Sequence, residues 1–147
     1  MDGVGGAHYL TYWNVSLDAE VEVEVTRVNE VAAHADAALT AYRETDFGYS
    51  PGLTVMRGVR IPEDSLGVCV SSDGWAIIHT NDEYFQTVTH SDRELDGMCQ
   101  RVWFGDILEV PSICFIDRES AVAVIDAWMS RGELLEAAGF SDDLFTC

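Results

Sequence analysis

Carboxylates are the most abundant chemically active groups in this sequence. Its 147 residues include 26 Asp and Glu but only 8 Lys and Arg, so the formal net charge is −18. Because so many carboxylates bring some pair close together in any fold, their number does not identify a glycosidase-like pair of acids. The charge disfavours direct binding to nucleic acid or to a membrane and favours a cationic partner. Adaptation to high salt is an alternative explanation for the acidity.

Histidines beside acids are the only arrangements that suggest a metal. His79 is followed by Asp82 and Glu83, and His90 by Asp92. The H-x-E and P-C-x-x-C halves of a zinc deaminase signature are both absent from the sequence. A lone histidine near carboxylates is more often a surface or core-edge residue, so we expect no metal site.

The cysteines offer a weak alternative of nucleophilic catalysis. Cys69 or Cys99 could meet a histidine in the fold, since such pairs form in space and not in sequence. No C-x-x-C motif, G-x-S-x-G elbow, P-loop or dinucleotide fingerprint occurs. We therefore expect four reduced structural thiols, no cofactor and no enzymatic activity. The four are Cys69, Cys99, Cys114 and Cys147.

Three glutamates form the most regular acidic pattern. Glu20, Glu22 and Glu24 alternate with valines, so a strand would project them from one face at intervals of roughly 7 Å. One interpretation is a solvated outer face. The other is a strip that attracts a basic protein, because opposed charges accelerate encounter.

Two short segments combine acids with large aromatic residues, as the centre and rim of a protein interface do. This interpretation requires that some of the aromatic side chains are accessible in the free protein. The candidates are Asp82, Glu83, Tyr84 and Phe85 in the first segment and Phe104, Asp106 and Glu109 in the second.

Hydrophobic periodicity predicts the elements that position these residues. A helical stripe predicts a helix over residues 29–42 with Asn29 as its N-cap. A second helix is expected from its cap at Asp117 to Ser130, followed by a Gly132 stop. A Ser72-Asp73-Gly74 turn indicates a hairpin. Strands are expected at residues 8–15, 20–25, 53–56, 66–70, 75–80, 84–89 and 101–105.

The order of these elements indicates the fold class. Strands flanked by two helices without regular βαβ alternation predict an α+β fold, a mainly antiparallel sheet with two principal helices packed on one side. The length, the evenly distributed charge and the lack of repeats predict a single domain over residues 1–147. The acidic, Gly-rich N-terminus does not resemble a signal peptide, so we expect a cytoplasmic protein.

The second half of the chain resembles a known family. The motifs that carry the resemblance are Trp103-Phe104-Gly105, Glu109-Val110-Pro111-Ser112, Ile116-Asp117-Arg118-Glu119-Ser120-Ala121 and Ile125-Asp126-Ala127-Trp128-Met129-Ser130-Arg131-Gly132. Together they are similar to the C-terminal signature of an immunity-protein family of bacterial polymorphic toxin systems, the family that is counted first among the immunity proteins of these systems. The resemblance covers about residues 50–132. Residues 133–140 look helical, whereas family members often close with a Val-x-Trp strand.

The resemblance implies a non-enzymatic antidote. Such a protein binds a cognate secreted toxin domain, often a nucleic-acid deaminase, and blocks its active site. A basic toxin domain bound one-to-one would also be complementary in charge to this acidic protein. Two alternatives remain open, namely a small acidic adaptor for another basic protein and a hydrolase.

Overall fold

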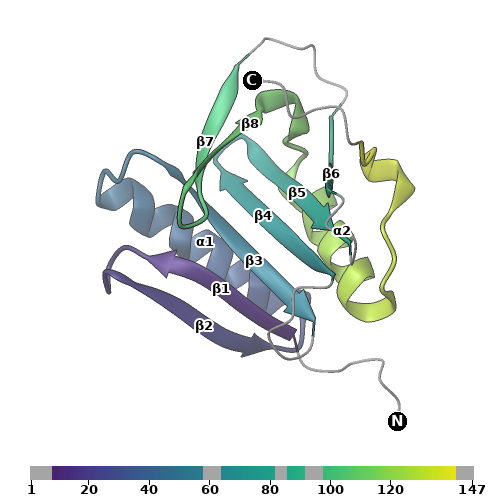
Figure 1. The fold of residues 1–147 in the computed structure, drawn as a ribbon, viewed down its shortest axis with the longest axis horizontal. Helices are drawn as coiled ribbons and strands as arrows, with labels where there is room; N and C mark the ends of the chain where they lie inside the picture. Colours follow the sequence, from purple (N-terminus) through teal and green to yellow (C-terminus); the bar gives the residue numbers. More distant parts are fainter. Residues whose placement is uncertain (1–7, 58–63, 82–85, 92–97, 142–147) are drawn as a thin grey trace.

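The fold is known from a computed structural model that describes residues 8–57, 64–81, 86–91 and 98–141. The described residues form a mostly antiparallel eight-stranded sheet with two α-helices on one of its faces (Figure 1). The expected α+β class is confirmed. Neither helix in these ranges is long and apolar enough to cross a membrane.

Six strands form the main path of the sheet, in the order β2-β1-β3-β4-β5-β6. A hairpin of β7 and β8 joins it through a short parallel pairing between β7 and β3. Neither β8 nor this parallel pairing was predicted from the sequence. The strands are β1 (His8–Asn14), β2 (Ala19–Val25), β3 (Ser50–Arg57), β4 (Ser65–Ser71), β5 (Gly74–Thr80), β6 (Gln86–Val88), β7 (Cys99–Trp103) and β8 (Ile107–Pro111).

The hairpin between β4 and β5 forms where the Asp-Gly turn predicts it. Ser71 lies opposite Gly74, and the Asp73 amide donates a hydrogen bond of 3.1 Å to the Ser71 hydroxyl. Gly74 has a φ of 139°, which side-chain-bearing residues rarely adopt. The turn therefore fixes which residues of β4 and β5 share a face.

The two helices begin and end for local reasons. Helix α1 (Val28–Glu44) begins one residue earlier than expected, with Arg27 as its N-cap. The expectation that Asn29 is the cap is wrong, because the Glu30 carboxylate already accepts the Arg27 amide at 3.1 Å. Helix α2 (Arg118–Arg131) has the expected Asp117 cap and a left-handed Gly132 at its end.

The main core lies between the helices and the inner face of the sheet. The alternation of β1 turns Leu10 inward, and the helical stripe turns Val31 and Ile125 toward it. Trp128 of α2 is fully buried there. The two helices thus occupy the inner face and leave the outer face for other elements.

The last part of the chain differs from the expectation. Residues 133–140 were predicted to be helical, but only the 3₁₀ turn η2 (Glu136–Ala138) forms there. Gly132 and Gly139 both adopt left-handed conformations, with φ of 68° and 70°, which end helical turns. A second 3₁₀ turn, η1 (Ser112–Cys114), links β8 to the segment before α2.

Candidate protein interface on the outer face of the sheet

The β7–β8 hairpin covers only part of the outer face. Val102 and Val110 of the hairpin pack on Cys69, Ala76 and Ile78 in a second buried cluster. The described part of the chain places no such cover over β2, β1 and the adjoining part of β3. We call this uncovered area the open sheet face. Its members are Tyr9, Thr11, Trp13, Glu20, Glu22, Glu24, Thr54 and Met56, with Phe104 at its border.

The strand register places acids beside aromatic residues on this face. Glu20 lies directly opposite Trp13, and Glu24 lies opposite Tyr9. The three glutamates of β2 are exposed, whereas the two aromatic side chains are half-buried. Strand β2 is at the end of the strand order. The expected acidic strip therefore exists, and it runs along the rim of an aromatic surface.

Phe104 of the β7–β8 turn borders the open sheet face because of a glycine. A Cβ built on Gly52 would lie 2.7 Å from the ring of Phe104, and one on Gly67 would lie 3.5 Å from it. The ring thus rests on the sheet where two neighbouring strands lack side chains. Phe104 remains partly accessible, so it is still a candidate for an aromatic contact residue in a protein interface.

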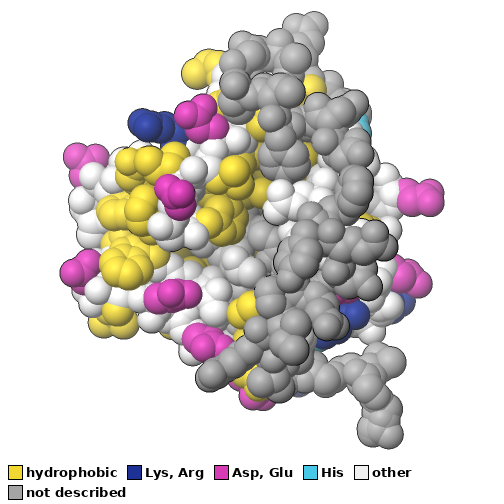
Figure 2. Space-filling view, viewed as in Figure 1, with side chains coloured by type: hydrophobic (Ala, Val, Ile, Leu, Met, Phe, Trp, Pro, Cys, Tyr) yellow, Lys and Arg dark blue, Asp and Glu magenta, His cyan; other side chains and the backbone are white. Residues whose placement is uncertain are grey.

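Figure 2 shows this side of the molecule. Hydrophobic side chains gather over the β7–β8 turn and β1, and Asp and Glu side chains lie among and around them. Ile107, the first residue of β8, is a large hydrophobic residue with 39% of its surface exposed. This arrangement of an apolar centre and a charged rim is typical of protein interfaces.

The remaining candidate interface residues fall into two groups, one on the β7–β8 hairpin and one outside the described residues. Asp106 and Glu109 are exposed on the hairpin. The Asp106 carboxylate accepts the Ile107 amide at 2.8 Å, and Glu109 lies opposite Arg101. The other four predicted residues lie outside the described residues, namely Asp82, Glu83, Tyr84 and Phe85.

Sequence reasoning missed the central strand of this surface. Tyr9, Thr11 and Trp13 had been assigned to a strand, but not to a site. Their period-two spacing places them on one face, and this signal could have identified them. The sequence alone does not show that the helices cover the opposite face of the sheet, and so it does not show that Tyr9, Thr11 and Trp13 lie on the uncovered face.

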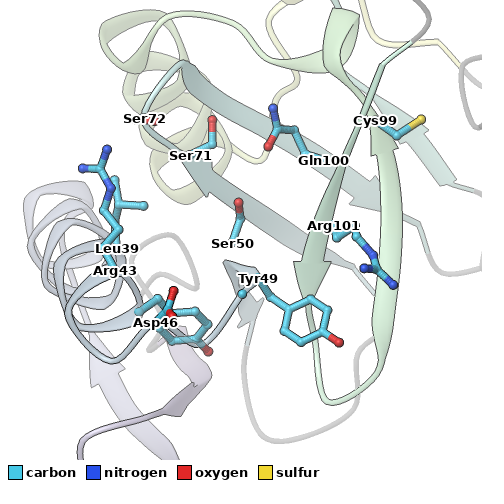
Figure 3. A pocket seen from close by; sticks show the side chains of 12 residues that line it. Leu39, Arg43, Asp46, Tyr49, Ser50, Ser71, Ser72, Cys99, Gln100 and Arg101 are labelled. Carbon is cyan, nitrogen blue, oxygen red and sulfur yellow. The ribbon is translucent and has the colours of Figure 1, made fainter.

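A larger hollow lies between α1, the start of β3 and β7 (Figure 3). Its volume is about 480 Å³, and Arg43, Ser71 and Gln100 line it from three different elements. Figure 3 shows Gln100 pointing into the hollow and Arg101 pointing away from it. The Arg101 guanidinium lies 5.6 Å from the ring centre of Tyr49. The lining offers hydrogen bonds but a single carboxylate, that of Asp46, and no histidine.

The two free thiols of the described residues are not arranged for nucleophilic catalysis. Cys69 and Cys114 are buried, and burial raises the pKa of the Cys69 thiol well above its usual range and that of Cys114 to about 11. A buried protonated thiol is a poor nucleophile. Cys99 is disulfide-bonded, so the expectation that all four thiols are reduced is wrong.

A polar cluster surrounds His79 at the inner face. His79 Nε2 lies 2.5 Å from Asp64 Oδ1, and the Trp128 indole N–H donates to the same oxygen at 3.2 Å. Arg57 lies 3.7 Å from this carboxylate and donates to the Trp128 carbonyl at 2.9 Å. Within the described ranges no hydroxyl or thiol is hydrogen-bonded to His79, so the nucleophile–base contact of a hydrolase is not formed there. The cluster joins α2 to β3, β4 and β5.

Metal ligation finds no support in the described ranges, which hold no group of three or more His, Cys, Asp and Glu residues able to bind an ion.

Comparisons of the chain with family models, with curated proteins and with solved structures gave no match. The open sheet face is thus the arrangement from which a function is best argued.

Proposed function

We propose that this chain is an immunity protein that binds a basic toxin domain and inhibits it without catalysing a reaction. The observation that carries the proposal is the open sheet face, where half-buried Tyr9 and Trp13 adjoin the exposed glutamates of β2. Aromatic side chains of this kind supply most of the binding energy in interfaces, and a charged rim surrounds them. The family resemblance supplies the class of partner.

The net charge supports a partner that normally handles nucleic acid. An enzyme of that kind, such as a nucleic-acid deaminase, presents a basic groove to phosphates. A protein with a net charge of −18 can occupy the groove through the same complementarity. Inhibition by occlusion requires no catalytic residue and no cofactor in the inhibitor.

Co-expression tests the proposal directly. The proposal predicts that the gene immediately upstream encodes a protein with a toxic C-terminal domain, which is the partner to co-express. The readouts are cell survival and a one-to-one complex in size-exclusion chromatography. We expect rescue, and a complex that weakens between low and high salt because surface charges are screened. Failure to rescue and to bind would overturn the proposal in favour of an adaptor or a hydrolase.

Charge reversal locates the interface. The variant Glu20→Lys, Glu22→Lys, Glu24→Lys reverses the rim of the open sheet face. We expect the association rate at low salt to fall roughly tenfold or more, because electrostatic steering contributes at least that factor. The rates of the variant and the wild type should converge at high salt.

A control variant separates local from overall charge. Glu44, Glu119 and Glu136 are exposed outside the open sheet face, and their reversal to Lys changes the net charge equally. We expect a clearly smaller effect on the association rate. Equal effects of the two triple variants would contradict the assignment of the interface to the open sheet face.

A further inference from the structure

A small pocket opens on the open sheet face, beside Phe104 at its border. Its cavity volume is about 80 Å³. Ligand sites for whole cofactors or drug-sized molecules measure roughly 300–1,000 Å³, so this pocket has room only for a small chemical group. The side chains that line it belong to Thr11, Trp13, Glu20, Thr54 and Phe104, with Gly52 beneath the phenyl ring.

The strand register explains how these residues come together. Glu20 of β2 lies opposite Trp13 of β1, and Thr11 of β1 lies opposite Thr54 of β3. Phe104 reaches the same place from the β7–β8 turn and rests above Gly52. The pocket therefore has aromatic side chains in its wall, a carboxylate at its edge and two hydroxyl groups from paired strands.

The polar groups of the pocket are available to a ligand. Within the described residues, the Glu20 carboxylate forms no ion pair or hydrogen bond, and neither do the hydroxyls of Thr11 and Thr54. Elsewhere in these ranges, acids such as Asp36 and Asp64 are paired with arginines of the same chain. The pocket thus presents unpaired acceptors beside the aromatic side chains of Trp13 and Phe104.

We propose that this pocket accepts the guanidinium group of one arginine side chain from the basic partner. A guanidinium has four heavy atoms, is planar and stacks on aromatic rings, and its five N–H donors suit one carboxylate and two hydroxyls. The Glu20 carboxylate would form a charge-assisted hydrogen bond with it. The identity of the ligand as a partner's side chain rests on the proposed function, but recognition of arginine does not require the toxin.

An NMR titration of the full chain tests the pocket. The probe is arginine capped at both ends, and the readouts are the Trp13 indole N–H and the Thr11 and Thr54 amides. Capped citrulline, which has nearly the same shape without the charge, is the matched control ligand, and capped lysine is the second comparison. We expect saturable shifts at these residues with arginine, at least fivefold weaker binding of lysine and at least tenfold weaker binding of citrulline.

Two single variants distinguish the pocket from general charge attraction. Glu20→Gln removes the pocket carboxylate, whereas Glu24→Gln removes an equal charge from the same face of β2 outside the pocket. We expect at least fivefold weaker arginine binding for the first variant and no change for the second. Trp13→Leu should also weaken binding at least fivefold while Glu20 is retained, because the stacking surface is lost.

Three outcomes would overturn the inference: equal binding of citrulline and arginine, equal weakening by Glu20→Gln and Glu24→Gln, or shifts that do not involve the pocket residues. Each variant's amide spectrum shows whether the fold is retained. If the toxin domain binds but capped arginine does not, only the pocket assignment fails. If capped arginine binds but the toxin is not neutralised, the proposed function fails and the pocket remains.

Discussion

Gly52→Ala is the substitution that best tests how the β7–β8 hairpin borders the open sheet face. The new Cβ would lie 2.7 Å from two ring carbons of Phe104, whereas ordinary contacts begin at 3.4 Å. The ring must therefore retreat by about 0.7 Å or leave its place on the sheet. Since Phe104 is only half-buried, leaving the sheet is the easier response.

The expected cost follows from this geometry. Forcing an extra methyl group into a packed site costs about 1–3 kcal/mol. Removing a half-buried Phe from its contacts costs about 1–1.5 kcal/mol, roughly half of the value for a fully buried side chain. Replacing a glycine by alanine returns about 0.4–1 kcal/mol through the unfolded chain. Because displacement of the ring is the easier response, the difference of these terms is a loss of up to about 1 kcal/mol in the free energy of unfolding of Gly52→Ala.

Gly67→Ala is the matched control. A Cβ at Gly67 would lie 3.5 Å from the same ring and 3.6 Å from Ile78, which are ordinary contacts. Urea unfolding followed by circular dichroism should show unchanged or slightly raised stability for this variant. In a Phe104→Ala background, Gly52→Ala should lose its cost as well, because the clashing ring is gone.

Equal stabilities of the Gly52→Ala and Gly67→Ala variants would refute the close contact between Phe104 and Gly52. A cost of Gly52→Ala that persists without the Phe104 ring would also refute it. Gly52→Ala should in addition weaken arginine binding in the pocket, since the displaced ring forms part of its wall.

Three further predictions concern the rest of the molecule. Burial and, secondarily, the charge of Arg57 lower the pKa of His8 below its usual 6.5, so protonation favours the unfolded state. The urea concentration at the midpoint of unfolding should therefore be highest above pH 6.5 and should fall as the pH decreases below 6.5. His8→Phe should reduce this fall. An identical pH profile for the variant would contradict the assignment of the pH dependence to His8. The buried Thr89 hydroxyl donates to the Cys114 carbonyl at 2.9 Å, so Thr89→Val should cost about 1–3 kcal/mol in urea unfolding, and Thr89→Ser should cost clearly less. Asp117→Ala should destabilise α2 by about 1 kcal/mol through loss of its N-cap, whereas Asp117→Asn should retain most of the stability.

Local features were determined by the sequence. The Asp117 cap and the Gly132 stop of α2 depend on neighbouring backbone groups, so their positions were predicted correctly. The alternation of β2 likewise placed its glutamates on the exposed side and Val25 in the core. Such patterns are readable because their periods of 2 and 3.6 residues relate side chains that are close in the chain. These periods locate the strands and helices along the chain, and the order of the strands and helices predicts the fold class.

Contacts between distant segments were decided by the tertiary structure. The parallel pairing of β3 with β7 and the contact of the Phe104 ring with Gly52 join residues about fifty positions apart. No local periodicity encodes which strand lies beside which, because that choice depends on how the helices and hairpins share the two faces of the sheet. Glu20 was a candidate from its spacing alone. Phe104 was a candidate as well, but its place beside Glu20, Trp13 and Thr54 depends on the β7–β8 hairpin, which covers β4 and β5 on the outer face and does not extend over β1 and β2.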